Sequence, residues 1–261
     1  MALQNQSLFN YGLQITSSNQ YITFGTTSAE TGLNARTATI ATGYYSLTSL
    51  ATAVAAALTS ADPLHFYAMS VNRNVAGGLQ NRVTLSTTNT FLSIFFGSGN
   101  QSNPATLLGF PLSDLTGATS YTGSSSAGTA FVPNLTQSNS LIPGYSYLSP
   151  NRMQKNFGAV NISSAGDKES IVFSLQFFSQ VMFKYIVESN IDPLWVPFVQ
   201  WMIQQREFEF TPDITQASTF YPVTLDDPDS GLSFNFSEML PDFPGLFQTP
   251  LMKFRVVTDG T

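Results

Sequence analysis

The chain has 261 residues, of which 43% are hydrophobic, 13% aromatic and only 10% charged. A charged fraction far below the ~25% of ordinary soluble domains, combined with many aromatic side chains, excludes disorder driven by net charge. Ten scattered basic residues in a chain of net charge −6 exclude a phosphate-binding groove for nucleic acid, and the lack of cysteine excludes disulfides, thiolate zinc sites and a cysteine nucleophile.

Short β-branched strands open the chain and are followed by one amphipathic helix. Residues 19–28 and 34–45 alternate loosely between apolar and polar side chains, which predicts strands. Four apolar residues then recur at helical spacing on one face: Leu47, Leu50, Val54 and Leu58. Ser46 or Thr48 can cap this helix, and Asp62-Pro63 ends it.

Strands resume after the helix. Three segments have strand composition: 65–73, 82–88 and 90–97. Residues 102–110 then predict one or two helical turns, with Ser102 or Asn103 as the cap, Pro104 at the first position and Gly109 as the stop. We therefore expect a β-rich N-terminal module with one main helix over residues 1–115.

The middle of the chain, residues 116–150, is rich in Gly, Ser and Pro but still carries many apolar side chains. This composition predicts an extended arm that lies on a neighbour, either its own subunit or another. Four aromatic residues of the arm are our candidate interaction residues: Tyr121, Phe131, Tyr145 and Tyr147.

Residues 151–261 hold most of the charge and predict a second β module with one helix. The helix begins either at Asp192-Pro193 or at Val196. Its expected buried stripe consists of Trp195, Phe198 and Met202, with Val199 as a further candidate. Strands are expected in 158–164, 169–189, 206–213, 220–227 and 250–259. In the segment 206–213, alternation predicts that Phe208 and Phe210 face the core and that Glu207 and Glu209 face solvent. The fold class is mainly β with a few short helices.

Candidate catalytic groups are few. His65, the single histidine, lies three residues after Asp62, but no G-x-S-x-G nucleophile elbow accompanies it, and a polar residue at a strand end is the simpler interpretation. Glu207 and Glu209 have a spacing that suits glycoside hydrolysis, and solvated strand-face charge explains them equally well.

Ligand and membrane motifs are equally sparse. The acidic stretch at 226–231 has the composition of a turn and does not fit the EF-hand calcium loop. No glycine-rich segment forms a phosphate-binding pattern, so no cofactor is expected. The most apolar helical stretch, Leu47–Leu58, is too short for the ~20 residues of a membrane span. The N-terminus shows no signal-peptide pattern.

Two stretches resemble virion proteins of tailed bacteriophages. The first runs from "ATGYYSLTSLATAVAAAL" to "FGSGNQSNPATLLGF", and the second from "LWVPFVQWMIQQREFEFTPD" through "FYPVTL" to "FRVV". The second resembles the C-terminal part of tail and baseplate adaptor proteins, including distal-tail proteins. This resemblance implies a helix-flanked β-sandwich of tail-tube or distal-tail type in the C-terminal module.

The resemblance and the composition together predict a structural protein rather than an enzyme. We expect a virion component of a phage tail or baseplate, assembled in the host cytoplasm, that forms a ring-like homo-oligomer such as a hexamer. Its other expected partners are neighbouring tail or baseplate proteins and fibres. The alternatives are a receptor- or glycan-binding or fibre-attachment module, a capsid decoration protein, and a cell-wall glycosidase.

Overall fold

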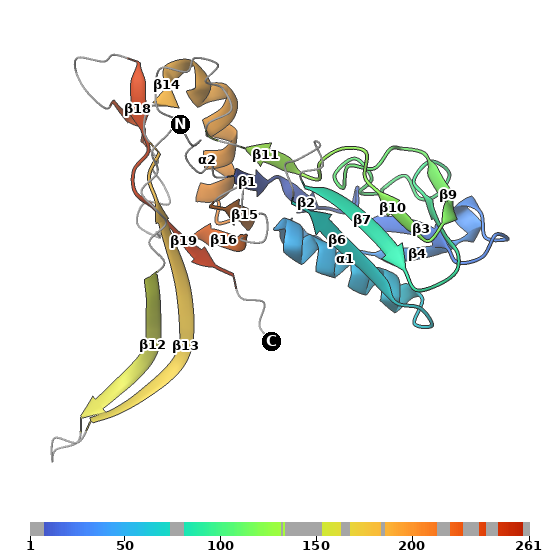
Figure 1. Ribbon diagram of the computed structural model, residues 1–261, viewed down its shortest axis with the longest axis horizontal. Coiled ribbons are helices and arrows are strands. Elements are labelled where there is room, and N and C mark those ends of the chain that lie inside the picture. Colours follow the sequence, from blue (N-terminus) through green and yellow to red (C-terminus); the bar gives the residue numbers. More distant parts are fainter. Residues whose placement is uncertain are drawn as a thin grey trace, which may run out of the picture. The chain divides into compact units, whose positions relative to one another are not determined.

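The computed structural model describes residues 8–73, 81–131, 133, 153–162, 168–183, 186–212, 220–226, 235–238 and 245–257. The chain divides into two compact units. The N-terminal unit consists of residues 5–132 together with 207–222, and the C-terminal unit consists mainly of residues 133–206 and 223–261. Both are mainly β (Figure 1), and each is considered by itself.

The N-terminal unit is built from short strands around one long helix. Its described helical elements are the α-helix α1 (Leu47–Ala61) and a 3-10 turn at Gly32–Asn34. Its described strands are β1 (Leu8–Tyr11), β2 (Leu13–Ile15), β3 (Tyr21–Gly25), β4 (Arg36–Thr39), β5 (Gly43–Tyr45), β6 (Tyr67–Asn72), β7 (Arg82–Thr87), β8 (Leu92–Phe95), β9 (Asp114–Ala118), β10 (Ser120–Thr122), β11 (Thr129–Phe131) and β15 (Phe208–Thr211).

All described strand pairs in this unit are antiparallel. They form the orders β4-β3-β8-β9, β10-β7-β6, β2-β5 and β11-β1-β15. In β7, Val83 and Leu85 are buried while Thr84 and Ser86 are partly exposed, as the alternation in the sequence predicts.

The helix α1 follows its sequence signals closely. The Ser46 side chain accepts from the Ser49 amide, and the Ser49 side chain accepts from the Ser46 amide, so a capping box starts the helix. The apolar stripe is buried and packs into the core of the unit: Leu47, Leu50, Ala51, Val54 and Leu58. The predicted helix is confirmed, and it ends at Ala61, directly before Asp62-Pro63.

The C-terminal unit contains the longest strands of the chain. Its described strands are β12 (Met153–Ile162), β13 (Lys168–Val181), β14 (Ile186–Val187), β16 (Tyr221–Leu225), β17 (Ser237–Glu238), β18 (Leu246–Gln248) and β19 (Met252–Val256). They pair in the orders β16-β19-β13-β12 and β14-β18-β17, all antiparallel. A 3-10 turn (Glu188–Asn190) and a π turn (Ile191–Trp195) lead into the helix α2 (Val196–Ile203).

Helix α2 begins at Val196, the second of the two predicted starts. Pro197 then lies in the first turn of the α-helix, where proline is tolerated. Trp195, Phe198 and Met202 are buried as predicted, and so is the further candidate Val199. Trp201 is buried with them. The Trp195 ring contacts the rings of Phe183 and Phe236 edge-on.

The observed division differs from the predicted boundaries in two places. The boundary after residue 115 falls inside β9, which pairs with β8, so residues 116–131 continue the N-terminal unit. Residues 207–222 were assigned to the C-terminal module but cluster with the N-terminal unit, because β15 pairs with β1. Local sequence patterns do not encode such long-range pairing.

Candidate functional site

The loop Asp62–Phe66 lies between α1 and β6, and we call it the α1–β6 loop. It carries the two most exposed large hydrophobic side chains among the described residues, Leu64 and Phe66. Its position follows from local sequence. A residue before proline is pushed out of helical conformation, and Asp62, which precedes Pro63, has φ −140° and ψ 83°. The helix therefore ends, and the chain turns toward β6.

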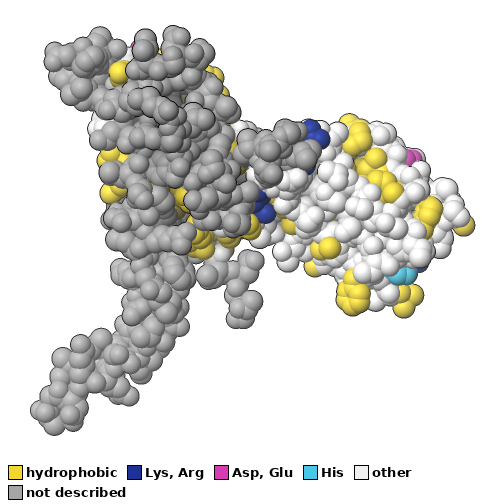
Figure 2. Space-filling model, viewed as in Figure 1, with side chains coloured by type: hydrophobic (Ala, Val, Ile, Leu, Met, Phe, Trp, Pro, Cys, Tyr) yellow, Lys and Arg dark blue, Asp and Glu magenta, His cyan; other side chains and the backbone are white. Residues whose placement is uncertain are grey.

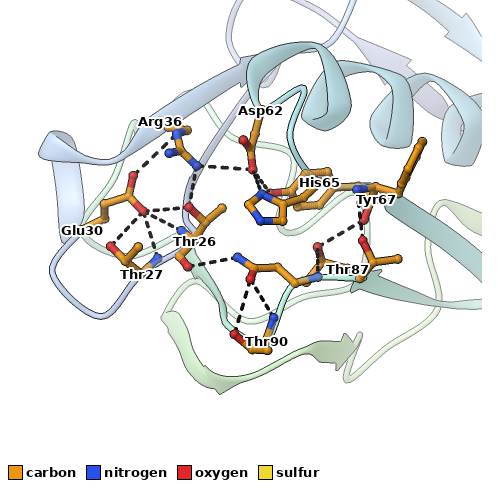
Figure 3. Close-up of polar contacts among 12 residues, drawn as sticks. Thr26, Thr27, Glu30, Arg36, Asp62, His65, Tyr67, Thr87 and Thr90 are labelled. Atoms are coloured by element: carbon orange, nitrogen blue, oxygen red, sulfur yellow. Dashed lines mark hydrogen bonds and ion pairs between the residues drawn. The ribbon is translucent and has the colours of Figure 1, made fainter.

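The Asp62 carboxylate is the centre of a polar network beneath this loop (Figure 3). It is buried, with 3% exposure, and its Oδ2 lies 2.7 Å from the Tyr67 hydroxyl and 2.7 Å from Nδ1 of His65. Nη1 of Arg36 lies 3.3 Å from the same oxygen. Burial raises the pKa of Asp62, but the hydrogen bonds from Tyr67 and His65 and the Arg36 charge outweigh it, so the pKa is lowered.

Arg36 links this carboxylate to a second one. Its Nε lies 3.6 Å from Glu30 Oε1, and Glu30 Oε2 accepts from the amides of Thr26 at 2.6 Å and Thr27 at 3.0 Å. Burial opposes ionisation of Glu30, but these amide hydrogen bonds and the Arg36 charge lower its pKa. Burial and the Asp62 hydrogen bond raise the pKa of Tyr67, which keeps its hydroxyl a donor.

The loop above this network carries exposed apolar side chains. Leu64 is 85% exposed and Phe66 is 75% exposed. The Phe66 backbone is nevertheless fixed, because its amide donates to Thr88 Oγ1 at 3.2 Å and its carbonyl accepts from the Thr88 amide at 3.1 Å. Figure 2 shows hydrophobic side chains gathered beside the single histidine.

The α1–β6 loop is better suited to apolar contact than to acid–base catalysis. Asp62 orients the His65 imidazole, as an aspartate does in a catalytic triad. Here, however, the carboxylate also accepts a hydrogen bond from Tyr67 and forms an ion pair with Arg36. In addition, exposed apolar residues directly precede and follow the histidine. The polar network therefore serves to hold an apolar loop in one conformation.

Glu209 corrects a sequence-based prediction, since it is 2% exposed rather than solvated. It forms a bidentate ion pair with Arg73, at 2.9 Å to Nε and 2.8 Å to Nη2. Thr48, at the start of α1, donates to Glu209 Oε2 at 2.8 Å, and the Arg73 guanidinium stacks 3.4 Å from the Phe220 ring centroid. Every residue of β15 is buried, because α1 supplies partners on the face that the alternation assigned to solvent.

Glu207, the other carboxylate of the predicted pair, is half-buried. Its Oε1 accepts from the Ser49 hydroxyl at 3.0 Å. Both glutamates are thus engaged by the first turn of α1. The buried ion pair was not visible in the sequence, where Arg73 and Glu209 stand 136 positions apart.

The four candidate interaction residues are divided by the structure. The Tyr121 hydroxyl donates to the Leu92 carbonyl at 2.7 Å and accepts from the Ala118 amide at 3.0 Å. Phe131 is buried at 5% exposure and stacks on Phe9. The described part of the predicted arm therefore lies on its own subunit. Tyr145 and Tyr147 lie outside the described residues.

A surface pocket of about 360 Å³ lies elsewhere on the N-terminal unit. Gly12, between β1 and β2, and Gly128, beside β11, form part of its wall. The other lining residues are uncharged: Asn19, Asn103, Thr106, Leu107 and Thr129. Its chemistry is neutral, with small side chains, amides, methyl groups and one leucine.

Metal and membrane features were also sought within the described ranges. Asp226, the first residue of the predicted acidic turn, lies 3.7 Å from Nε of Arg255, and residues 227–234 are outside those ranges. Over the described residues, no group of three or more His, Cys, Asp or Glu side chains is arranged to hold a metal ion. None of the described helices is long and apolar enough to cross a membrane.

Comparison with known proteins does not place the chain in a family. No protein-family model matches it, and no curated protein is significantly similar to it. The functional argument therefore rests on the residues and geometry above.

Proposed function

We propose that this protein is a structural component of a virion, in the tail or baseplate of a tailed bacteriophage, and that it works by self-association. The proposal combines the sequence resemblance to tail and baseplate adaptor proteins with one structural observation that favours assembly. That observation is the two-stranded ribbon formed by β12 and β13.

The ribbon is long and has few described partners. β13 spans 14 residues, about 45 Å at the rise of a β-strand. It pairs with β19 only over Phe178–Val181, and over Lys168–Phe177 its one partner among the described strands is β12. Figure 1 shows β12 and β13 continuing together past β19.

A ribbon of this kind is suited to pairing with another chain. A two-stranded hairpin is marginally stable in water, and its two edges carry unpaired N–H and C=O groups. Addition of a strand from a second copy would satisfy those groups and give the ribbon the third strand that independent stability needs. Ring assembly through such edges is the mode of action that we propose.

The composition favours the same role. A polar surface made of hydroxyls and amides rather than ions costs less to bury against a protein partner. In the C-terminal unit, α2 accompanies the β16-β19-β13-β12 and β14-β18-β17 sheets, and we propose that this arrangement is the helix-flanked β-sandwich of tail-tube or distal-tail type.

Shortening the ribbon tests the proposal. A variant in which Asn-Gly replaces residues 158–173 keeps the five register pairs from Met153↔Phe178 to Phe157↔Ser174 and lets a two-residue turn close the hairpin. We expect the wild type to sediment as a closed oligomer and the shortened variant as a smaller species. The matched control replaces only residues 163–167 with Asn-Gly, which retains every register pair, and should assemble like the wild type.

Two results would contradict the proposal. One is a wild type that stays monomeric up to its solubility limit. The other is a shortened variant that assembles as the wild type does, which would show that self-association does not need the ribbon.

The alternative of receptor or glycan binding, or fibre attachment, rests on Tyr145 and Tyr147 outside the described residues and stays a prediction. The glycosidase alternative rested on the spacing of Glu207 and Glu209, and Glu209 is buried in an ion pair with Arg73.

A further inference from the structure

The exposed side chains of the α1–β6 loop are too small a surface to hold a partner alone. Leu64 and Phe66 together offer on the order of 300 Å² of apolar area, judged from the size of such side chains. A stable interface needs about 800 Å² from each partner. The loop is therefore suited to be an anchor within a larger interface, such as the one that the proposed ring assembly supplies.

The loop is ordered before any partner arrives. Asp62 is fixed by Tyr67, His65 and Arg36, and the Phe66 backbone is fixed by Thr88. A contact residue that is already held in place loses less conformational entropy on binding, so an anchor of this kind contributes more of its apolar burial to affinity.

The pocket between Gly12 and Gly128 has the properties that such an anchor requires. Its volume of about 360 Å³ is at the lower end of the ~300–1,000 Å³ of ligand pockets. The backbone at both glycines forms part of its wall, and Leu107 provides apolar surface.

The two amide side chains of the pocket wall are already bonded within their own unit. Asn19 donates to the Gln14 carbonyl and accepts from the Thr16 amide, and Asn103 donates to the carbonyls of Phe96 and Asn100. An apolar side chain could therefore enter without stripping these amides of their partners.

The loop and the pocket lie at opposite ends of α1. Gly12 directly precedes Leu13, which pairs with Tyr45, the residue before the helix cap Ser46. The loop instead follows Ala61, one helix length of about 22 Å away. A fixed loop at that distance does not reach the pocket of its own molecule, and a second copy can bring the two together.

We propose that the α1–β6 loop of one copy inserts Phe66, with Leu64 beside it, into the Gly12–Gly128 pocket of the next copy. The inference deepens the proposed self-association and rests on it. Because two different surfaces meet, the contact is head-to-tail, and repeated contacts of this kind close into a ring or extend as a filament. None of the described residues that line the pocket is charged, so two copies of an acidic chain can meet there without repulsion between like charges in the pocket.

Self-association of a serine variant is the first test. Phe66→Ser should weaken assembly by about tenfold or more in sedimentation, as expected for loss of an interface anchor. The matched control is Leu112→Ser, which removes an apolar side chain that is 68% exposed in the same unit and should leave assembly unchanged.

Cross-linking provides the second test, since the chain has no cysteine. Leu64→Cys protein mixed with Thr129→Cys protein should give a covalent dimer with a short bismaleimide, and neither variant should do so alone. Replacing Leu64→Cys by Leu112→Cys in the mixture should abolish the dimer.

The outcomes separate the two proposals. If the wild type assembles but Phe66→Ser assembles equally well and the mixture gives no more dimer than the control, the loop–pocket contact is refuted and the proposed function stands. If the wild type does not self-associate at all, the proposed function fails, and this inference fails with it.

Discussion

Buried ionic groups define the N-terminal unit at the scale of single residues. Asp62 and Glu209 are both almost fully buried, and each carries a guanidinium partner and a hydroxyl donor. A buried charge persists only when it is paired and hydrogen-bonded. In a chain with so few charged side chains, these buried carboxylates hold loops and strands in place.

Asp62 should make stability sensitive to acid. Its pKa is lowered in the folded state, so the unfolded state binds the proton more readily. The stabilisation is then present above the ordinary carboxyl pKa of about 4 and is lost as pH falls through the folded pKa. Asp62→Asn should cost about 1–3 kcal/mol at neutral pH and show a shallower loss in acid, measured by urea unfolding at several pH values.

Tyr67→Phe is the control for that experiment, because it removes one hydroxyl and leaves the Asp62 carboxylate with His65 and Arg36. It should lose about 1 kcal/mol and retain part of the acid response, because the hydrogen bond from His65 and the Arg36 charge still lower the Asp62 pKa. An Asp62→Asn protein that weakens in acid as steeply as the wild type would show that other carboxylates carry the response.

Glu209 and Glu207 form a matched pair for the second residue-scale prediction. Glu209→Gln breaks the buried ion pair and leaves Arg73 without its counter-charge, which should cost about 3–5 kcal/mol. Glu207→Gln retains an oxygen acceptor for Ser49 at a half-buried position and should cost less than about 1 kcal/mol. Chemical denaturation of both variants measures the difference, and equal losses would contradict the assignment.

Turns and strands, at the scale of elements, depend on contacts that local sequence only partly encodes. The segment after Asn103 forms the predicted helical turn: Asn103 accepts from the Ala105 amide, Leu108 donates to the Pro104 carbonyl, and Gly109 ends the turn with φ +76°. A Cβ on Gly109 would lie 2.2 Å from the Ser125 carbonyl oxygen. Two separate constraints therefore require glycine at this position.

Gly109→Ala should consequently be more destabilising than Gly117→Ala. Both glycines have positive φ, which costs an L-residue about 1–2 kcal/mol, but a Cβ at Gly117 meets nothing within 4 Å. The additional loss at Gly109 measures the backbone clash with Ser125. Equal thermal midpoints for the two variants would show that the segment around Ser125 moves aside without loss of stability.

The division into two units is the main feature at the scale of the whole molecule. The chain contributes residues 5–132 to the N-terminal unit and returns to it with residues 207–222. This return places β15 beside β1 and brings Glu209 to Arg73 and Thr48. The strand β15, which carries Glu209, is thus part of the N-terminal unit.

Interactions between residues close in the sequence explain which elements could be predicted. The helix α1, its Ser46 cap, the late start of α2 and the buried faces of β7 follow from spacing, capping and proline chemistry. The same reasoning missed β17 and β18, which have two and three residues and exist only through their partners.

The sequence by itself determined a mainly β chain of low charge, with one capped helix that ends at Asp62-Pro63. These features depend on neighbours within a few positions. Only the tertiary structure decided that Glu209 is buried, that Tyr121 and Phe131 lie on their own unit, and that Leu64 and Phe66 remain exposed. The reason is that burial depends on which distant segments pack together, and alternation along one strand does not show what covers its second face.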